Sequence, residues 1–166
     1  MARRIDYSAR YTPPAEKVYS ALTNRDYWEA RMVELRKFSD NHVESFEVGD
    51  DGIDLVFHHI IPRDTLPDIA QTVMKKDMVI TRKEHYSPFG EPVTGTYHAS
   101  IPAGPGSLTG TMSLFRTDTG CTLRTSSEAK VFIPFVGGKL EQVMLVNLVD
   151  LFRTEAQVTA DWLAEQ

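Results

Sequence analysis

Hydrophobic and polar residues alternate over much of this chain. From Ile5 to Tyr11 every odd position is apolar and every even position is charged or polar. A period of two predicts a half-buried β-strand over residues 3–11, because successive side chains of a strand point to opposite faces. Similar apolar segments, separated by turns rich in Gly, Pro and Asp, predict six more strands. These lie at residues 42–48, 52–61, 77–86, 93–101, 107–117 and 121–133.

Three other segments have helical spacing. Pro13 and Pro14 end the first strand, and Pro suits a first helical turn, so a short helix is predicted over residues 14–22. Asn24 is a good N-cap for a second helix that reaches residue 37. The longest helix is predicted over residues 139–165, which contain neither Gly nor Pro. Its first half is apolar almost all round, so other elements must enclose it.

This order of elements predicts an α+β fold in one domain, residues 1–166. One apolar face of an antiparallel sheet must be covered, and only the C-terminal helix is large enough to cover it. We therefore expect a curved, seven-stranded antiparallel sheet that grips this helix, with the two short helices after the first strand. The strand parities agree with this arrangement. One inward set is Val93, Tyr97, Ala99 and Ile101.

Two segments strengthen this expectation: the entry to the first helix, Tyr11 to Tyr19, and the entry to the last, Ile133 to Glu141. With the order of elements, they resemble the START-like (SRPBCC) helix-grip superfamily, which includes the major birch-pollen allergen, lipid-transfer START domains and polyketide aromatase/cyclases. Residues 131–141 are similar to an uncharacterised bacterial branch of it. The resemblance implies the helix-grip fold over essentially the whole chain. It does not choose among carriers, receptors and enzymes, which share this fold.

Composition excludes several classes of partner. A net charge of -5 argues against nucleic-acid binding, which needs a basic surface. The single cysteine, Cys121, predicts a reducing, cytoplasmic location. The apolar part of the last helix spans about 13 residues, fewer than a bilayer requires, so we expect no stable membrane insertion. Exposed Val143 and Val146 would favour a protein-interaction module or a homodimer.

A helix-grip fold often encloses a cavity between sheet and helix, typically of ~300–1,000 Å³ for a ligand pocket. A large empty apolar void is destabilising, so bulky side chains or a hydrophobic guest should fill it. Inward polar residues would orient the polar end of a ligand or bond each other. The residues expected to line the cavity are Phe57, His59, Tyr97, Met112, Thr125, Met144, Asn147, Leu148 and Leu151.

Candidate catalytic groups are His59, Arg82 and Glu84. A single inward histidine such as His59 is more often a satisfied core residue than a general base. Arg82 and Glu84 share the parity of inward Met78 and Ile80. We favour a surface salt bridge on an edge strand, and the alternative is a charged pair that reaches the pocket, where Arg82 could bind a ligand carboxylate. The histidines lack metal-site spacing, so no metal or other cofactor is expected.

The predicted function is binding or transport of a small hydrophobic molecule, such as a lipid, a fatty acid or a polyketide-like compound. Two alternatives stay open: a cyclase or aromatase that uses the same cavity, and a protein-interaction module without a small ligand. The long connection at residues 62–76 contains several apolar residues. We interpret it as a lid over the cavity.

Overall fold

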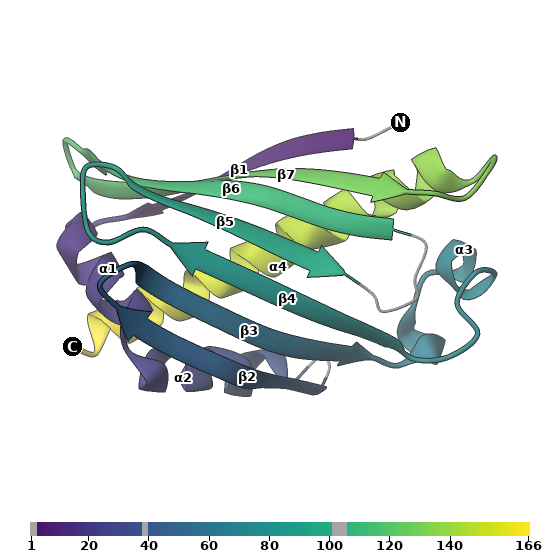
Figure 1. Ribbon diagram of the computed structural model, residues 1–166, viewed down its shortest axis with the longest axis horizontal. Coiled ribbons are helices and arrows are strands. Elements are labelled where there is room, and N and C mark those ends of the chain that lie inside the picture. Colours follow the sequence, from purple (N-terminus) through teal and green to yellow (C-terminus); the bar gives the residue numbers. More distant parts are fainter. Residues whose placement is uncertain (1–2, 38–39, 101–105) are drawn as a thin grey trace.

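Seven strands form one antiparallel sheet in the computed structural model, which describes residues 3–37, 40–100 and 106–166 (Figure 1). The strand order is β1-β7-β6-β5-β4-β3-β2, so β2 to β7 form a meander and β1 pairs with β7. The strands are β1 (Arg3–Tyr11), β2 (Asp40–Gly49), β3 (Gly52–Ile61), β4 (Met78–Tyr86), β5 (Val93–Ser100), β6 (Gly106–Thr117) and β7 (Gly120–Val131). The helices are α1 (Ala15–Leu22), α2 (Arg25–Leu35), a 3-10 turn η1 (Arg63–Thr65), α3 (Asp68–Gln71) and α4 (Gly137–Ala164).

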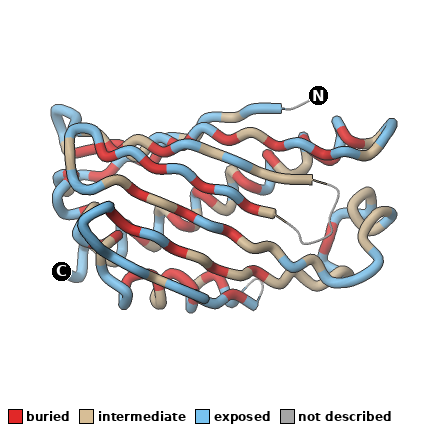
Figure 2. The backbone as a smooth tube through the Cα atoms, in the orientation of Figure 1, coloured by how far each residue is buried: buried red, intermediate tan, exposed pale blue. Residues whose placement is uncertain are grey.

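The predicted fold class is confirmed. The sheet curves around α4, which crosses its inner face, packs on β1 and β7 and meets α1 and α2 towards its C-terminal end (Figure 1). Buried residues run along the strands at alternate positions, as the period of two predicted (Figure 2). The first strand has the predicted bounds and pairs with β7 from Arg3 opposite Ala129 to Tyr11 opposite Cys121. Ile101, predicted to point inward, lies outside the described residues.

Two glycines allow close approach. A Cβ on Gly110 in β6 would lie 2.1 Å from Cε1 of Tyr97, so the Tyr97 ring lies directly on the glycine backbone. A Cβ on Gly137 would lie 2.8 Å from the Val131 carbonyl oxygen, so this glycine lets the start of α4 contact the end of β7. Any larger residue at either position forces its neighbour to move.

The connection between β3 and β4 is held by its own hydrogen bonds. The Arg63 side chain donates from Nε to the Met74 carbonyl at 2.7 Å and from Nη2 to the Gln71 carbonyl at 2.8 Å. Gln71 in turn donates to the carbonyl of Leu66, which is buried. The segment contains η1 and α3. Its role as a lid stays a prediction.

The favoured interpretation of Arg82 and Glu84 was wrong. Their strand, β4, lies between β3 and β5 and is therefore interior. Arg82 is 6% exposed and Glu84 is 3% exposed, so neither belongs to a surface salt bridge. Both side chains lie on the same face of the strand as Met78 and Ile80 and point towards the space between the sheet and the helices. This corresponds to the alternative interpretation, a charged pair that reaches the interior.

No helix in the described part of the chain combines the length and the apolar character that crossing a bilayer requires.

Candidate functional site

The inward face of α4 changes from apolar to polar along its length. Leu145, Leu148 and Phe152 are buried, and Glu155 and Thr159 continue the same spacing of three and four residues and are buried too. This spacing keeps all five side chains on one face of the helix. The helix therefore directs a carboxylate and a hydroxyl into the interior, at the end where it meets α2.

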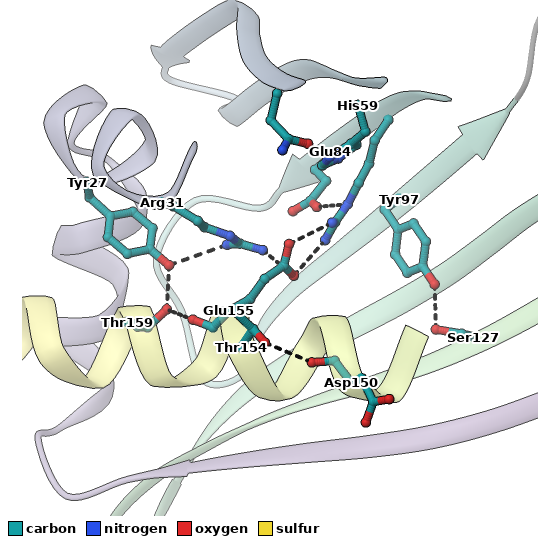
Figure 3. Close-up of polar contacts among 12 residues, drawn as sticks. Tyr27, Arg31, His59, Glu84, Tyr97, Ser127, Asp150, Thr154, Glu155 and Thr159 are labelled. Atoms are coloured by element: carbon teal, nitrogen blue, oxygen red, sulfur yellow. Dashed lines mark hydrogen bonds and ion pairs between the residues drawn. The ribbon is translucent and has the colours of Figure 1, made fainter. Parts of the chain in front are cut away.

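Helix α2 contributes a buried arginine to the same region. Arg31 follows Tyr27 by one helical turn, and its guanidinium lies over the Trp28 ring, 4.7 Å from the ring centroid. Its Nη2 forms an ion pair with Oε1 of Glu155 at 2.5 Å, and its Nη1 donates to the Tyr27 hydroxyl at 3.3 Å. The Tyr27 hydroxyl lies 2.5 Å from Oγ1 of Thr159, so α2 and α4 are joined by hydroxyls as well as by charge (Figure 3).

Strand β4 contributes the second arginine. Arg82 binds Glu155 through both terminal nitrogens, with Nη1 at 2.9 Å from Oε2 and Nη2 at 3.2 Å from Oε1. Its Nε pairs with Oε2 of Glu84 at 2.6 Å, and Oε1 of Glu84 accepts from the Tyr86 hydroxyl at 2.7 Å. We call Arg31, Arg82, Glu84 and Glu155 the buried charge cluster (Figure 3). Two positive and two negative groups make it neutral when all four are ionised.

Mutual pairing keeps Glu155 and the two arginines charged. Burial alone would raise the pKa of Glu155, but Arg31 and Arg82 outweigh burial and lower this pKa to about 2. Burial alone would lower the pKa of Arg31 and of Arg82, but Glu155 and Glu84, with other polar neighbours, together outweigh burial and raise each pKa. Phe57, whose ring centroid lies 5.1 Å from the Arg82 guanidinium carbon, adds a cation–π contact.

One donor of the cluster is unused. Among the described residues, Nε of Arg31 is buried and has no hydrogen-bond acceptor. A buried donor without a partner destabilises a protein by about 1–3 kcal/mol. A ligand oxygen that accepts from this N–H would remove that penalty. Buried polar groups without a partner are rare in native proteins, so this one calls for an explanation.

A cavity of about 50 Å³ lies beside the cluster, between the sheet, α1, α2 and the second half of α4. Its apolar walls include Ala9, Val18, Leu22, Met112, Leu123 and Ala156. Its polar walls include all four members of the buried charge cluster. The volume is several-fold below the ~300–1,000 Å³ of a typical ligand pocket. Aromatic rings and the charge cluster fill most of the space around the cavity, which is one of the two outcomes expected from the sequence: bulky side chains or a hydrophobic guest.

The structure brings together only part of the predicted site. Five of the predicted residues line the cavity: Arg82, Glu84, Tyr97, Met112 and Thr125. Phe57, His59 and Leu148 are buried outside its lining, and Met144 and Leu151 are half-buried at earlier positions of α4. Asn147 is exposed, because one residue before the buried Leu148 lies on another face of the helix. A ligand in this cavity would not contact Asn147.

His59 is a buried core residue in this conformation. Burial first, and then the Arg82 charge, lower its pKa to about 4, so the ring is neutral at pH 7. Its Nδ1 contacts the side-chain oxygen of Asn41, and its Nε2 has no partner among the described residues. The catalytic roles suggested for His59, Arg82 and Glu84 stay predictions. In the described ranges, no group of three or more His, Cys, Asp or Glu side chains is placed to hold a metal ion.

Sequence reasoning missed Arg31, Glu155 and Thr159. The signal for Glu155 was present, because it follows Phe152 by three residues and Leu148 by seven. The same holds for Arg31, which follows Tyr27 by four. The helical spacing of Glu155 and Arg31 from apolar residues would have been enough to predict that both lie on buried faces. Charged residues are almost never fully buried unless they are paired, and the pairs here join segments far apart in the chain.

A family model described as "Protein of unknown function (DUF2505)" matches residues 6–163. Curated relatives include the uncharacterized proteins Rv0481c of Mycobacterium tuberculosis H37Rv and Mb0491c of Mycobacterium bovis. Each is 32% identical over 171 residues, with 98% of this chain and 98% of the relative covered.

Solved structures share the fold at low identity. Zhui aromatase/cyclase from Streptomyces sp. R1128 has a TM-score of 0.59 at 12% identity, over 99% of this chain and 94% of that chain. Ara h 8.0201 has a TM-score of 0.56 at 9% identity, over the whole of both chains. TTHA0849 from Thermus thermophilus has a TM-score of 0.57 at 14% identity, over 99% of this chain and 98% of that chain. These likenesses confirm the START-like helix-grip fold that the sequence resemblance predicted.

Proposed function

We propose that this chain, which belongs to the DUF2505 family, binds a small, uncharged, mainly apolar molecule between the sheet and α4. The observation that supports this most directly is that Arg31, whose Nε–H has no acceptor, lines a cavity that has both apolar and polar walls. Binding sites commonly combine apolar walls with a few fixed polar groups. A ketone, aldehyde or hydroxyl oxygen would accept from Arg31 while the rest of the molecule meets the apolar wall.

The charge balance of the cluster selects against ionised ligands. Both carboxylates are already paired with Arg31 and Arg82, so no cation is left to neutralise an incoming carboxylate. Adding an unpaired charge to a buried neutral cluster is strongly unfavourable. Arg82 already holds the carboxylate of Glu155, in the position that a ligand carboxylate would need. Among the predicted ligands, this favours a neutral polyketide-like fragment over a fatty acid.

The cavity volume also limits the guest. About 50 Å³ admits only a few non-hydrogen atoms without rearrangement. A long-chain lipid would require the cavity to expand several-fold. We therefore expect affinity to depend on the size of the guest as well as on its charge, with the smallest neutral ketones entering without movement of α1 or α4.

The experiment is a thermal-shift and calorimetric titration with ketones and carboxylates of matched, rising size: acetone against acetate, cyclohexanone against cyclohexanecarboxylate, and acetophenone against benzoate. We expect the ketones to raise the melting temperature and the carboxylates to leave it unchanged. Saturation at roughly one hundred times Kd corresponds to about 2.7 kcal/mol of stabilisation. Native mass spectrometry of protein purified from its own host would reveal a bound natural ligand by its mass.

A matched pair of variants localises the binding. Ala156 lines the cavity, and Ala160, one turn further along α4, is exposed. Ala156→Leu should fill the cavity and abolish ketone binding, while Ala160→Leu should leave binding unchanged. Equal binding by both variants, or a preference for the carboxylates, would refute the proposal.

A further inference from the structure

The segment that joins β7 to α4 exposes an unusual amount of apolar surface. We call residues 132–136 the apolar loop. Phe135 is fully exposed and Phe132 is 64% exposed, while Ile133 and Val136 are half-buried beside them. The apolar loop lies at the end of the molecule near the N-terminus of β1, away from α1 (Figure 1). Single exposed apolar residues are ordinary, but a contiguous group of them marks an interaction surface.

The backbone of the apolar loop holds Phe135 outward. The Val136 N–H donates to the Pro134 carbonyl at 2.9 Å, and the Gly137 N–H donates to the Ile133 carbonyl at 3.0 Å. In this turn Phe135 has φ +73°, the left-handed region that Gly or Asn adopts far more readily than a bulky aromatic residue. The chain therefore places a large apolar side chain in water at a position where glycine would be more stable. The left-handed backbone is unfavourable for a bulky residue, and the exposed ring gains no stabilisation from burial in return, which points to a role for Phe135 outside the folded core.

Basic side chains surround the apolar loop. Lys130 lies over the Phe132 ring, with Nζ 5.0 Å from the ring centroid, and Lys139 is exposed in the first turn of α4. The Arg3 guanidinium lies beside Gly138, since a Cβ added there would be 3.5 Å from its Nη2.

The acidic residues nearest in sequence offset only part of these charges. Glu128 is paired with Arg4 at 2.9 Å. Glu141 is buried and accepts from the Val131 N–H at 2.9 Å. The surface around the apolar loop is therefore basic although the chain as a whole carries a net charge of -5.

We propose that the apolar loop docks this protein on an anionic lipid surface. Phe132 and Phe135 enter the boundary between headgroups and acyl chains, and Lys130, Lys139 and Arg3 meet the lipid phosphates. A narrow, projecting loop suits a soft lipid surface better than a protein partner, which usually buries about 800 Å² on each side. In this arrangement the protein lies on the surface and inserts no helix.

Co-sedimentation with vesicles tests this inference. We expect binding to vesicles of phosphatidylcholine mixed with phosphatidylglycerol, weak binding to phosphatidylcholine alone, and loss of binding as salt rises. Phe135→Ser should weaken binding about tenfold or more. Lys130→Gln and Lys139→Gln should each weaken it about fivefold. These side chains are exposed, so circular dichroism and the melting temperature should not change.

Two variants at the other end of the molecule are the controls. Phe89→Ser removes an aromatic side chain that is 44% exposed between β4 and β5, and Lys17→Gln removes an exposed charge from α1. Both should bind vesicles as the natural chain does. No binding to anionic vesicles, or equal loss in Phe89→Ser and Phe135→Ser, would overturn the inference. A dimer in light scattering that Phe135→Ser abolishes, without vesicle binding, would also overturn it and assign the apolar loop to self-association.

Discussion

Removing the charge of Glu155 should destabilise the fold strongly. Glu155→Gln keeps the shape of the side chain but leaves Arg31 and Arg82 with only Glu84 as a counter-charge. Breaking one partner of a buried ion pair typically destabilises a protein by about 3–5 kcal/mol. The fall of the Glu155 pKa from 4.5 to about 2 gives a similar figure, about 3 kcal/mol, at about 1.4 kcal/mol for each pKa unit. Either value is a large part of a domain's total stability of about 5–15 kcal/mol.

The Glu155 carboxylate also makes the stability of the fold sensitive to acid over a defined pH range. The pKa of Glu155 is lower in the folded chain than in the unfolded chain, so its contribution to stability is complete above about pH 4.5. It is lost as the pH falls towards 2, because protonation then breaks the pairs with Arg31 and Arg82. Glu155→Gln should lack this part of the pH dependence.

Urea unfolding near neutral pH, followed by circular dichroism, measures the effect. The midpoint should fall for Glu155→Gln while the slope stays constant. Asp150→Asn is the matched control on α4, since its pair with Arg153 is exposed and should contribute less than about 0.5 kcal/mol. A loss below about 1 kcal/mol for Glu155→Gln would show that the buried charge cluster does not hold the helices to the sheet.

Replacing the whole buried charge cluster is a different perturbation. With Leu or Met at all four positions no unpaired charge remains, and replacement of buried ion pairs by apolar residues is often neutral or stabilising. We expect this variant to be more stable than Glu155→Gln. The opposite ranking would mean that hydrogen-bond geometry, and not charge balance, accounts for the effect.

Three further predictions follow from other positions. Burial lowers the pKa of His59 to about 4, so stability should fall as the pH drops from about 6.5 to 4, and His59→Gln should remove that slope in pH-dependent melting. Gly110→Ala should destabilise by about 1–3 kcal/mol in urea unfolding because its Cβ meets the Tyr97 ring, whereas Gly49→Ala, with no atom within 4 Å, should be nearly neutral. Burial raises the pKa of the Cys121 thiol to about 11, so a thiol reagent near pH 8 should react slowly until urea unfolds the chain, and rapid labelling of the folded protein would contradict its burial.

Local pattern predicted most of the fold and little of the site. Alternation placed β1 and β3 at their observed bounds because each strand has one face in the core. The long helix was predicted because residues 139–165 contain neither Gly nor Pro, and the first half of this segment is apolar on nearly all sides, which is typical of a buried helix.

The cavity could not be predicted in the same way, because its volume depends on how particular side chains pack. Gly110, for example, lets the Tyr97 ring lie directly on the strand backbone, which no pattern of apolar positions reveals. The buried charge cluster depends on pairs such as Arg82 with Glu155, which are 73 residues apart. The pattern of apolar and polar positions predicts that each charged residue is exposed. Burial becomes favourable only when an oppositely charged partner lies across the core, and the pattern does not show that partner.

Glu155 ties α2 and β4 to the last helix through Arg31 and Arg82, and this has a kinetic consequence. A ligand that widens the cavity must move α2 and β4 away from α4. This movement separates opposite charges in a medium of low dielectric constant. The association rate would then be limited by how often the ion pairs of Glu155 separate, and it would lie well below the rate of diffusional collision. Departure meets the same barrier, so occupancy should persist after the surrounding concentration of the guest has fallen.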